Sequence, residues 1–329
     1  MPQINRRTLL GGAAVTSVLA TTSTTATFME GSLRSIKGKS ILITGCSSGF
    51  GRLAAESYAK SGAKVFATMR NLPRTEAEEL ERLARDKDLD LHVIEIDVLD
   101  DEQVAKGVAE AERLAGGALD VLINNAGIST AGPVEIQDME ATKLLFDTNV
   151  FGPQRLMRAV LPNMRAAKSG QIFNVTSQLG RVIVPAYGQY SPTKFALEAM
   201  SEQIAYELVP HNIDVTIVEP GGYPTKIWAS SNTLTRQLLA RAEEKHLNGY
   251  VGLVEQLGQR SGGGSTDPMD VPNAMAEIMA MPPGTRPLRR EVHPGPKPQM
   301  PINKVSAEAQ VGWLGGSPFG PWIKAVHNV

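Results

Sequence analysis

Residues 40–51 read Ser40-Ile-Leu-Ile-Thr-Gly-Cys-Ser-Ser-Gly-Phe-Gly51. A short apolar run, predicted to be a strand, leads directly into glycines spaced G-x3-G-x-G, and a helix is predicted over residues 52–61. Glycines allow the backbone to approach a pyrophosphate, which the free N–H groups and the positive dipole end of a helix N-terminus attract. The spacing differs from the commoner G-x-G-x-x-G. It predicts a nucleotide-phosphate loop, and an ordinary glycine-rich turn is the alternative.

The rest of the chain alternates strand and helix patterns. The strand-like runs are short and rich in Ile and Val, as in strands buried on both faces of a parallel sheet. The predicted strands are 40–44, 64–69, 91–97, 119–124, 171–176 and 213–219, and the predicted helices include 52–61, 101–115, 142–166 and 194–209. This alternation predicts one α/β domain over residues 31–292, a doubly wound parallel sheet of the Rossmann type.

Two later segments depart from the alternation. Residues 223–259 are predicted to be a largely helical, amphipathic excursion, and Gly262-Gly-Gly-Ser265 a flexible link. A helix is expected over 267–281, with Asp267 and Pro268 at its start. The following stretch, 282–301, is crowded with proline and is expected to form no regular helix. Residues 293–329 are a Pro/Gly-rich C-terminal tail, which is expected to wrap over the domain, contact a second subunit, or be disordered.

The first thirty residues are predicted to be a targeting segment and not part of the fold. Arg6 and Arg7 precede Thr8-Leu-Leu10 and a weakly apolar stretch that ends near Ala20. That stretch is too short for a permanent span, which takes ~20 apolar residues. The pattern resembles a twin-arginine export signal, associated with export of folded, cofactor-loaded proteins. A periplasmic or otherwise exported protein is expected, and a cytoplasmic one if the signal is not used.

Composition excludes several classes of function. The 329 residues include 33 basic and 34 acidic side chains, so no strong net field favours nucleic acid or an acidic membrane. The five histidines have no metal-ligand spacing, and no metal site is predicted. Cys46 is the only cysteine, which excludes an intrachain disulfide.

Tyr190 and Lys194 are the strongest candidates for catalysis. They stand four residues apart at the start of a predicted helix and therefore share one face. A free tyrosine, with a pKa of about 10, is a poor base near neutrality. A lysine ammonium one turn away and a positive nicotinamide ring would favour the phenolate. Ser177 follows the strand 171–176 and is expected to hydrogen-bond the substrate oxygen. A Tyr-x3-Lys pair alone is common by chance, and a structural role is the alternative.

The end of the second strand bears on the choice of nucleotide. Thr68-Met-Arg-Asn71 contains no carboxylate to bind a ribose 2′-OH, whereas Arg70 can bind a 2′-phosphate. NADP(H) is therefore expected in preference to NAD(H), and a solvated loop arginine is the alternative. Asp97, at the end of the third strand, is expected to hydrogen-bond the adenine amino group or, alternatively, to cap the next helix.

Together these motifs resemble the short-chain dehydrogenases/reductases over residues ~38–292. Asn124-Asn-Ala-Gly127, Asn149 and Pro220-Gly221 complete the family's pattern in the expected order. The segments TGCSSGFG (residues 44–51) and Arg286–Arg289 resemble the corresponding sequences of the 17β-hydroxysteroid-dehydrogenase-like branch. The resemblance implies an oxidoreductase that interconverts an alcohol and a ketone or aldehyde by hydride transfer, within one domain.

The resemblance also assigns roles to residues. Tyr190 would be the acid/base, Ser177 would orient the reacting oxygen, Lys194 would lower the pKa of Tyr190 and hold the ribose, and Asn149 would hold a relay water. The implied cofactor-binding residues are Gly45, Ser47, Ser48, Gly49, Phe50, Gly51, Arg70, Asp97, Val98, Asn125, Gly127, Tyr190, Lys194, Pro220, Gly221 and Thr225. Gly222 and Pro224 depart from the family's loop and weaken the assignment of Thr225.

Residues 223–259 would form a substrate lid. Their apolar side chains favour a moderately apolar small molecule as substrate, and core packing is the alternative. The resemblance also implies a homo-oligomer, because members of the family pack through the helices that correspond to residues 142–166 and 194–209.

Two other functions remain as alternatives, a non-enzymatic nucleotide-binding or redox-sensing protein and a sugar-nucleotide epimerase. The complete Ser177–Tyr190–Lys194 set argues against the first. The glycine spacing and the absence of a longer C-terminal substrate domain argue against the second.

Overall fold

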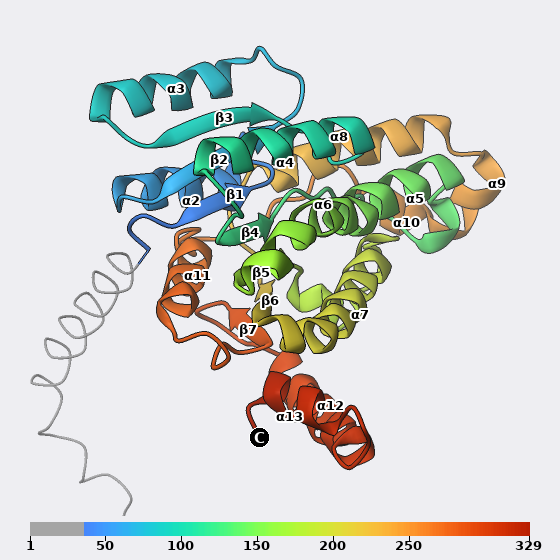
Figure 1. Cartoon of the computed structure of the whole chain (residues 1–329). Helices are drawn as coiled ribbons and strands as arrows, with labels where there is room; N and C mark the ends of the chain where they lie inside the picture. The colour runs from blue at the N-terminus through green and yellow to red at the C-terminus, as the bar shows by residue number, and fades with distance from the viewer. Residues whose placement is uncertain (1–35) are drawn as a thin grey trace, which may run out of the picture.

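The computed structural model describes residues 36–329, so the predicted export signal lies outside the described residues. Within that part of the chain no helix is both long enough and apolar enough to cross a membrane. Its centre is one seven-stranded parallel sheet with the order β3-β2-β1-β4-β5-β6-β7 (Figure 1). The strands are β1 (Ser40–Ile43), β2 (Lys64–Met69), β3 (Leu91–Glu95), β4 (Val121–Asn124), β5 (Gly170–Val175), β6 (Ile213–Pro220) and β7 (Arg289–Val292).

The strand order confirms the predicted doubly wound fold. The chain starts at β1, winds outward to β3, returns to β4 and winds outward again to β7. Every residue of β1, β4 and β5 is buried, because helices cover both faces of these strands. The order reverses between β1 and β4, and in such sheets ligands bind at this switch point, beyond the carboxyl ends of the strands.

Two helical layers cover the sheet (Figure 1). One layer packs on one face of the sheet and consists of α2 (Gly49–Lys60), α3 (Thr75–Lys87) and α11 (Asp270–Ala280). The other packs on the opposite face and consists of α4 (Asp101–Ala115), α6 (Gly152–Ala167) and α7 (Tyr190–Leu208). The remaining helices are α5 (Met139–Phe146), α8 (Ile227–Arg241), α9 (Glu244–Leu247), α10 (Val251–Val254), α12 (Gln299–Leu314) and α13 (Gly320–His327).

The helix expected over residues 142–166 is not continuous. A π-helical turn (Asp147–Phe151) separates α5 from α6. Such turns inside α-helices occur frequently at functional sites. Here the turn contains Asn149, one of the predicted site residues. Apolar periodicity cannot detect one inserted residue, which is why the sequence predicted a single helix.

The C-terminal expectations need correction. The proline-rich stretch contains β7, and α12 begins at Gln299 with Pro301 in its first turn, where proline removes no helical hydrogen bond. The tail is therefore not disordered but folds into a helical hairpin, α12 and α13 (Figure 1). His327 Nε2 lies 2.7 Å from the hydroxyl of Tyr206 on α7, so the hairpin lies against α7.

The glycine run after the excursion also differs from the expected flexible link. A Cβ on Gly262 would lie 2.2 Å from the Trp228 ring, and a Cβ on Gly263 would lie 2.1 Å from the backbone nitrogen of Pro224. These two glycines are therefore packed against the start of the excursion. Residues 223–259 themselves are largely helical, as α8, α9 and α10.

Candidate active site

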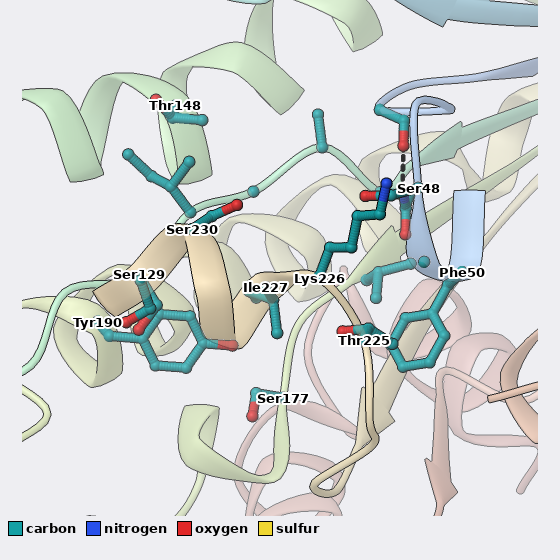
Figure 2. A pocket seen from close by; sticks show the side chains of 18 of the residues that line it. Ser48, Phe50, Ser129, Thr148, Ser177, Tyr190, Thr225, Lys226, Ile227 and Ser230 are labelled. Atoms are coloured by element: carbon teal, nitrogen blue, oxygen red, sulfur yellow. Dashed lines mark hydrogen bonds between the residues drawn. The ribbon is translucent and has the colours of Figure 1, made fainter. Parts of the chain in front are cut away.

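A cavity of about 640 Å³ opens at the carboxyl ends of β1, β2, β4, β5 and β6. Figure 2 shows Tyr190 and Ser177 on one side of this cavity and Ser48 and Phe50 on the other. The predicted site residues that line it are Gly45, Ser47, Ser48, Gly49, Phe50, Arg70, Asp97, Val98, Asn125, Gly127, Ser177, Tyr190, Lys194, Pro220, Gly221 and Thr225. Of the predicted site residues, only Gly51 and Asn149 do not line the cavity.

The phosphate loop is built so that its backbone comes close to its neighbours. Gly45 has φ +74°, and a Cβ there would lie 2.9 Å from the Cα of Ala126. A Cβ on Gly51 would lie 2.5 Å from Nδ2 of Asn125, and that amide donates to the carbonyl of Thr44 at 2.8 Å. Ser48, the N-cap of α2, makes no side-chain cap, which leaves the first N–H groups of α2 for a ligand. These residues fit a pyrophosphate.

The far end of the cavity carries cationic side chains. The Arg70 side chain is 54% exposed, and its Nη1 lies 4.0 Å from Oδ2 of Asp97. Arg74, which is not among the predicted site residues, also lines the cavity, and its Nη1 donates to the carbonyl of Arg70 at 3.4 Å. It was missed because α3, which begins at Thr75, was not among the predicted helices. Asp97 does not cap α4, since Asp100 does so.

Ser177, Tyr190 and Lys194 meet at the other end, and all three are buried. Ser177 follows β5, and its Oγ accepts from the N–H of Leu179 at 3.1 Å. Tyr190 and Lys194 occupy successive turns at the start of α7. The Lys194 ammonium donates to the carbonyl of Val175 at 3.0 Å and lies 5.7 Å from the centre of the Tyr190 ring.

Burial dominates the protonation of this pair. It raises the pKa of Tyr190 to about 12, and a hydrogen bond from Ser177 opposes that rise. Burial lowers the pKa of Lys194 to about 8, and the carboxylate of Glu198 opposes the fall. In the protein alone the pKa of Tyr190 is thus raised by burial, whereas a lowering by Lys194 was expected. Both groups favour their neutral forms more than free side chains do.

Asn149 is fully buried and fixes the loop that follows β4. Its Oδ1 accepts from the N–H of Ile128 at 2.9 Å, and its Nδ2 donates to the carbonyl of Ile128 at 2.9 Å. A Cβ on Gly127 would lie 3.3 Å from Oδ1 of Asn149 and 3.6 Å from Nζ of Lys194. Gly127, which lines the cavity, therefore lies beside both Asn149 and Lys194.

The start of the helical excursion closes one wall of the cavity. Figure 2 shows Thr225, Lys226 and Ile227 between the phosphate loop and Tyr190. Thr225 packs on the loop, since a Cβ on Gly49 would lie 3.5 Å from the Cβ of Thr225. Lys226 was not among the predicted site residues, and only its position in the cavity wall beside the phosphate loop suggests a role.

Comparison with known proteins identifies the class. The family model described as short chain dehydrogenase matches residues 39–235, more than half of the chain. The chain therefore belongs to the short-chain dehydrogenases and is an oxidoreductase, which confirms the resemblance drawn from the motifs. The match does not distinguish the 17β-hydroxysteroid-dehydrogenase-like branch, which stays a prediction.

Particular relatives share much of the chain. It is 35% identical to the mitochondrial D-beta-hydroxybutyrate dehydrogenase of Mus musculus over 259 residues, 74% of each chain. A short-chain dehydrogenase from Streptomyces avermitilis has a similar structure, with a TM-score of 0.67, 32% identity and coverage of 84% of this chain and 96% of that one. A gluconate 5-dehydrogenase from Burkholderia cenocepacia, solved with NADP and tartrate, matches with a TM-score of 0.55 and 28% identity over 60% of this chain and 76% of that one.

Proposed function

We propose that this protein is an NADP(H)-dependent oxidoreductase that interconverts an alcohol and a ketone or aldehyde, with Tyr190 as the acid/base. The observation that carries the proposal is one cavity with a glycine cradle at one end and buried Ser177, Tyr190 and Lys194 at the other. A bound nicotinamide ring supplies or accepts the hydride in such a site.

The chain's own residues handle the proton and the orientation. Tyr190 gives its hydroxyl proton to the carbonyl oxygen in reduction and accepts it back from the alcohol in oxidation. Ser177 donates a hydrogen bond to the same oxygen and holds it beside Tyr190. The Lys194 ammonium, one turn along α7, stabilises the phenolate that remains after reduction. Asn149, hydrogen-bonded to both backbone groups of Ile128, holds the wall on which a water can relay protons to Lys194.

Preference for NADP(H) rests on the cationic end of the cavity. Arg70 and Arg74 both line it, and β2 ends at Met69 without a carboxylate. A 2′-phosphate placed there would receive charge-assisted hydrogen bonds, whereas a 2′-OH would meet no acceptor from β2. The gluconate 5-dehydrogenase that shares this fold was solved with NADP, which agrees with the proposal.

The substrate is proposed to be a small, moderately apolar alcohol or carbonyl compound. Beside Tyr190 the cavity is lined by apolar side chains, together with a few hydroxyls that can orient a ligand. The apolar lining residues there are Ile128, Leu179, Ile227, Trp228 and Leu234. The first three helices after β6 would then act as the lid.

Export to the periplasm is proposed from the Arg6-Arg7 signal in the sequence alone. Fractionation of cells that express the full chain, compared with a variant in which Arg6 and Arg7 are both lysine, measures it. Export of the wild type and cytoplasmic retention of the variant would support the signal. Equal distribution of the two would refute it.

Tyr190→Phe tests the catalytic assignment. The ring is retained and one buried hydroxyl is lost, so the variant should fold and bind NADPH as the wild type does. Its turnover of any alcohol or carbonyl compound found in a substrate screen should fall by about 10²- to 10⁴-fold, the usual size of a general acid–base contribution. Comparable turnover in the two proteins would remove Tyr190 from the mechanism.

A further inference from the structure

A buried cluster of charges lies directly behind the catalytic helix. Its centre is Arg289, the first residue of β7, whose Nε lies 3.0 Å from Glu198 and whose Nη2 lies 2.7 Å from Glu202. Glu219, near the end of β6, lies 3.5 Å from the same Nε. One guanidinium therefore forms ion pairs with three carboxyl groups. Two of these, on Glu198 and Glu219, are fully buried. An arrangement that takes charges out of water is costly and has to be compensated by close geometry.

Glu198 connects this cluster to the catalytic residues. It stands one turn after Lys194 on α7 and accepts a hydrogen bond from Oγ1 of Thr176 at 2.7 Å. Thr176 lies between Val175, whose carbonyl accepts from Lys194, and Ser177. The turn after Ser177 packs on the same side chain, since a Cβ on Gly180 would lie 3.1 Å from Cγ of Glu198. Glu198 thus contacts both segments that carry catalytic groups.

The C-terminal hairpin closes the other side of the cluster. Nδ2 of Asn303, on α12, donates to Oε2 of Glu219 at 2.8 Å and to Oε1 of Glu291 at 2.8 Å. His327, on α13, lies 3.7 Å from Glu202. The hairpin therefore contributes polar groups to the support of the site while lying outside the cavity.

We propose that Glu198, held by Arg289, is a positioning residue that fixes the end of β5 against α7 and sets the electrostatic surroundings of the Lys194 amine. The inference rests on the proposed function for its meaning in catalysis, but the ionisation of Lys194 can be measured without turnover. A purely structural ion pair between α7 and β7 would leave that ionisation unchanged.

The charges around Lys194 determine the direction of the expected effect. Glu198 opposes the lowering of the Lys194 pKa by burial, so its loss lowers that pKa further. The titratable and charged groups packed around Lys194 and Glu198 are Tyr190 and Glu202 on α7, Arg181 after the Ser177 turn, Glu219 on β6, Arg289 and Glu291 on β7, and His327 on α13. Glu202 contacts the same arginine as Glu198 but lies two turns from Lys194, which makes it a matched control.

The experiment compares Glu198→Gln with Glu202→Gln in the full-length protein. Lys194 is titrated by competitive labelling with acetic anhydride over a range of pH, followed by peptide mass spectrometry. In Glu198→Gln the labelling midpoint of Lys194 should move down by about one pH unit, as expected for removal of one nearby buried charge. In Glu202→Gln it should stay within about 0.3 unit of the wild type. An unchanged midpoint in Glu198→Gln, or equal shifts in both variants, overturns the proposal.

Two further comparisons cover the remaining outcomes. If Glu198→Gln does not fold, Glu198→Asp replaces it. This variant keeps the carboxylate on a side chain that is one methylene shorter, so the labelling midpoint of Lys194 should move in the same direction but by less. If the wild type turns over no alcohol or carbonyl compound while the midpoint shifts as expected, the proposed function fails and the positioning role stands. Where turnover is measurable, Glu198→Gln should lower kcat more than it changes KM, because Glu198 does not line the cavity.

Discussion

At the scale of single residues, Arg70 is the side chain that should separate the two nicotinamide nucleotides. Arg70→Asp replaces a cation, whose Nη1 lies 4.0 Å from Oδ2 of Asp97, with an anion at the same end of the cavity. Charge-assisted hydrogen bonds contribute ~1.5–3 kcal/mol, so NADPH binding should weaken by roughly 10- to 100-fold or more, while NADH binding should hold or improve. Calorimetry on the purified protein measures both constants.

Arg85→Ala is the control for this comparison, because Arg85 is an exposed arginine on α3 that does not line the cavity. It should bind both nucleotides as the wild type does. If Arg70→Asp and Arg85→Ala bind NADPH equally well, Arg70 has no part in nucleotide choice.

Glu219 predicts a dependence of stability on pH. Burial raises its pKa from an ordinary 4.5 to about 8, and Glu198 adds to the rise while Asn303 and Arg289 oppose it. Because the folded-state pKa is raised, this contribution to stability is complete below about pH 4.5 and is lost as the pH rises through about 8. Glu219→Gln keeps the side chain neutral throughout, so its Tm relative to the wild type should rise between about pH 5 and 9.

Differential scanning calorimetry at several pH values tests this, with each kcal/mol worth about 2–4 °C in a domain of this size. The control is Glu277→Gln, since Glu277 pairs with Arg290 at the surface. Its Tm offset from the wild type should not vary in the way expected for Glu219→Gln. A constant offset for Glu219→Gln would mean that this carboxyl is ionised in the native protein.

At the scale of elements, the sequence was most informative where one segment carries its own signal. The apolar run of β1 and the glycine loop that leads into α2 are local, and both are found in the predicted order, although α2 begins at Gly49 and not at residue 52. The Tyr190–Lys194 spacing likewise brings both side chains to one cavity because a helix brings i and i+4 together. These features could be predicted because nothing distant in the chain has to be known.

Features that depend on distant partners were missed. Arg74 stands directly before α3 and lines the cavity. Glu198 contacts Thr176, 22 residues earlier, and Arg289, 91 residues later. The proline content around Pro301 concealed α12, because composition does not tell a helix's first turn from its interior. The π-helical turn at Asn149 was missed for a similar reason, since it changes the register without changing the apolar pattern.

The glycine run after α10 gives a prediction at the same scale. Gly263→Ala places a methyl group 2.1 Å from the Pro224 backbone, at a residue with φ +90°, so the base of the excursion must move. We expect a fall in Tm of several degrees and weaker substrate binding, with loss on the order of 1–3 kcal/mol from overpacking. Gly264→Ala is the matched control, because it also has positive φ (+51°) but meets nothing within 4 Å. Thermal unfolding that is the same for both variants would show that the run is not packed as described.

At the scale of the whole molecule, two helices, α7 and α12, carry exposed aromatic side chains. Phe195 on α7 is 37% exposed and Trp313 on α12 is 77% exposed. We expect a homo-oligomer that packs through α7, so Phe195→Asp should dissociate it, while Trp313→Asp should not. Sedimentation velocity measures the change in mass. A protein that is monomeric before substitution, or that dissociates only on substitution of Trp313, would refute packing through α7.

The order of the sheet has a consequence for how the protein is made. β7 and the hairpin that follows it are synthesised last, yet Arg289 is the cation that faces Glu198 and Glu219. Until β7 leaves the ribosome, β6 is an open edge, and two carboxylates destined for the interior have no guanidinium beside them. The nascent chain therefore cannot complete the support behind Lys194 before Arg289 has emerged, however early the nucleotide loop forms. A ribosome stalled shortly before Arg289 should hold a chain whose first strands are protected from protease while α7 is still cut.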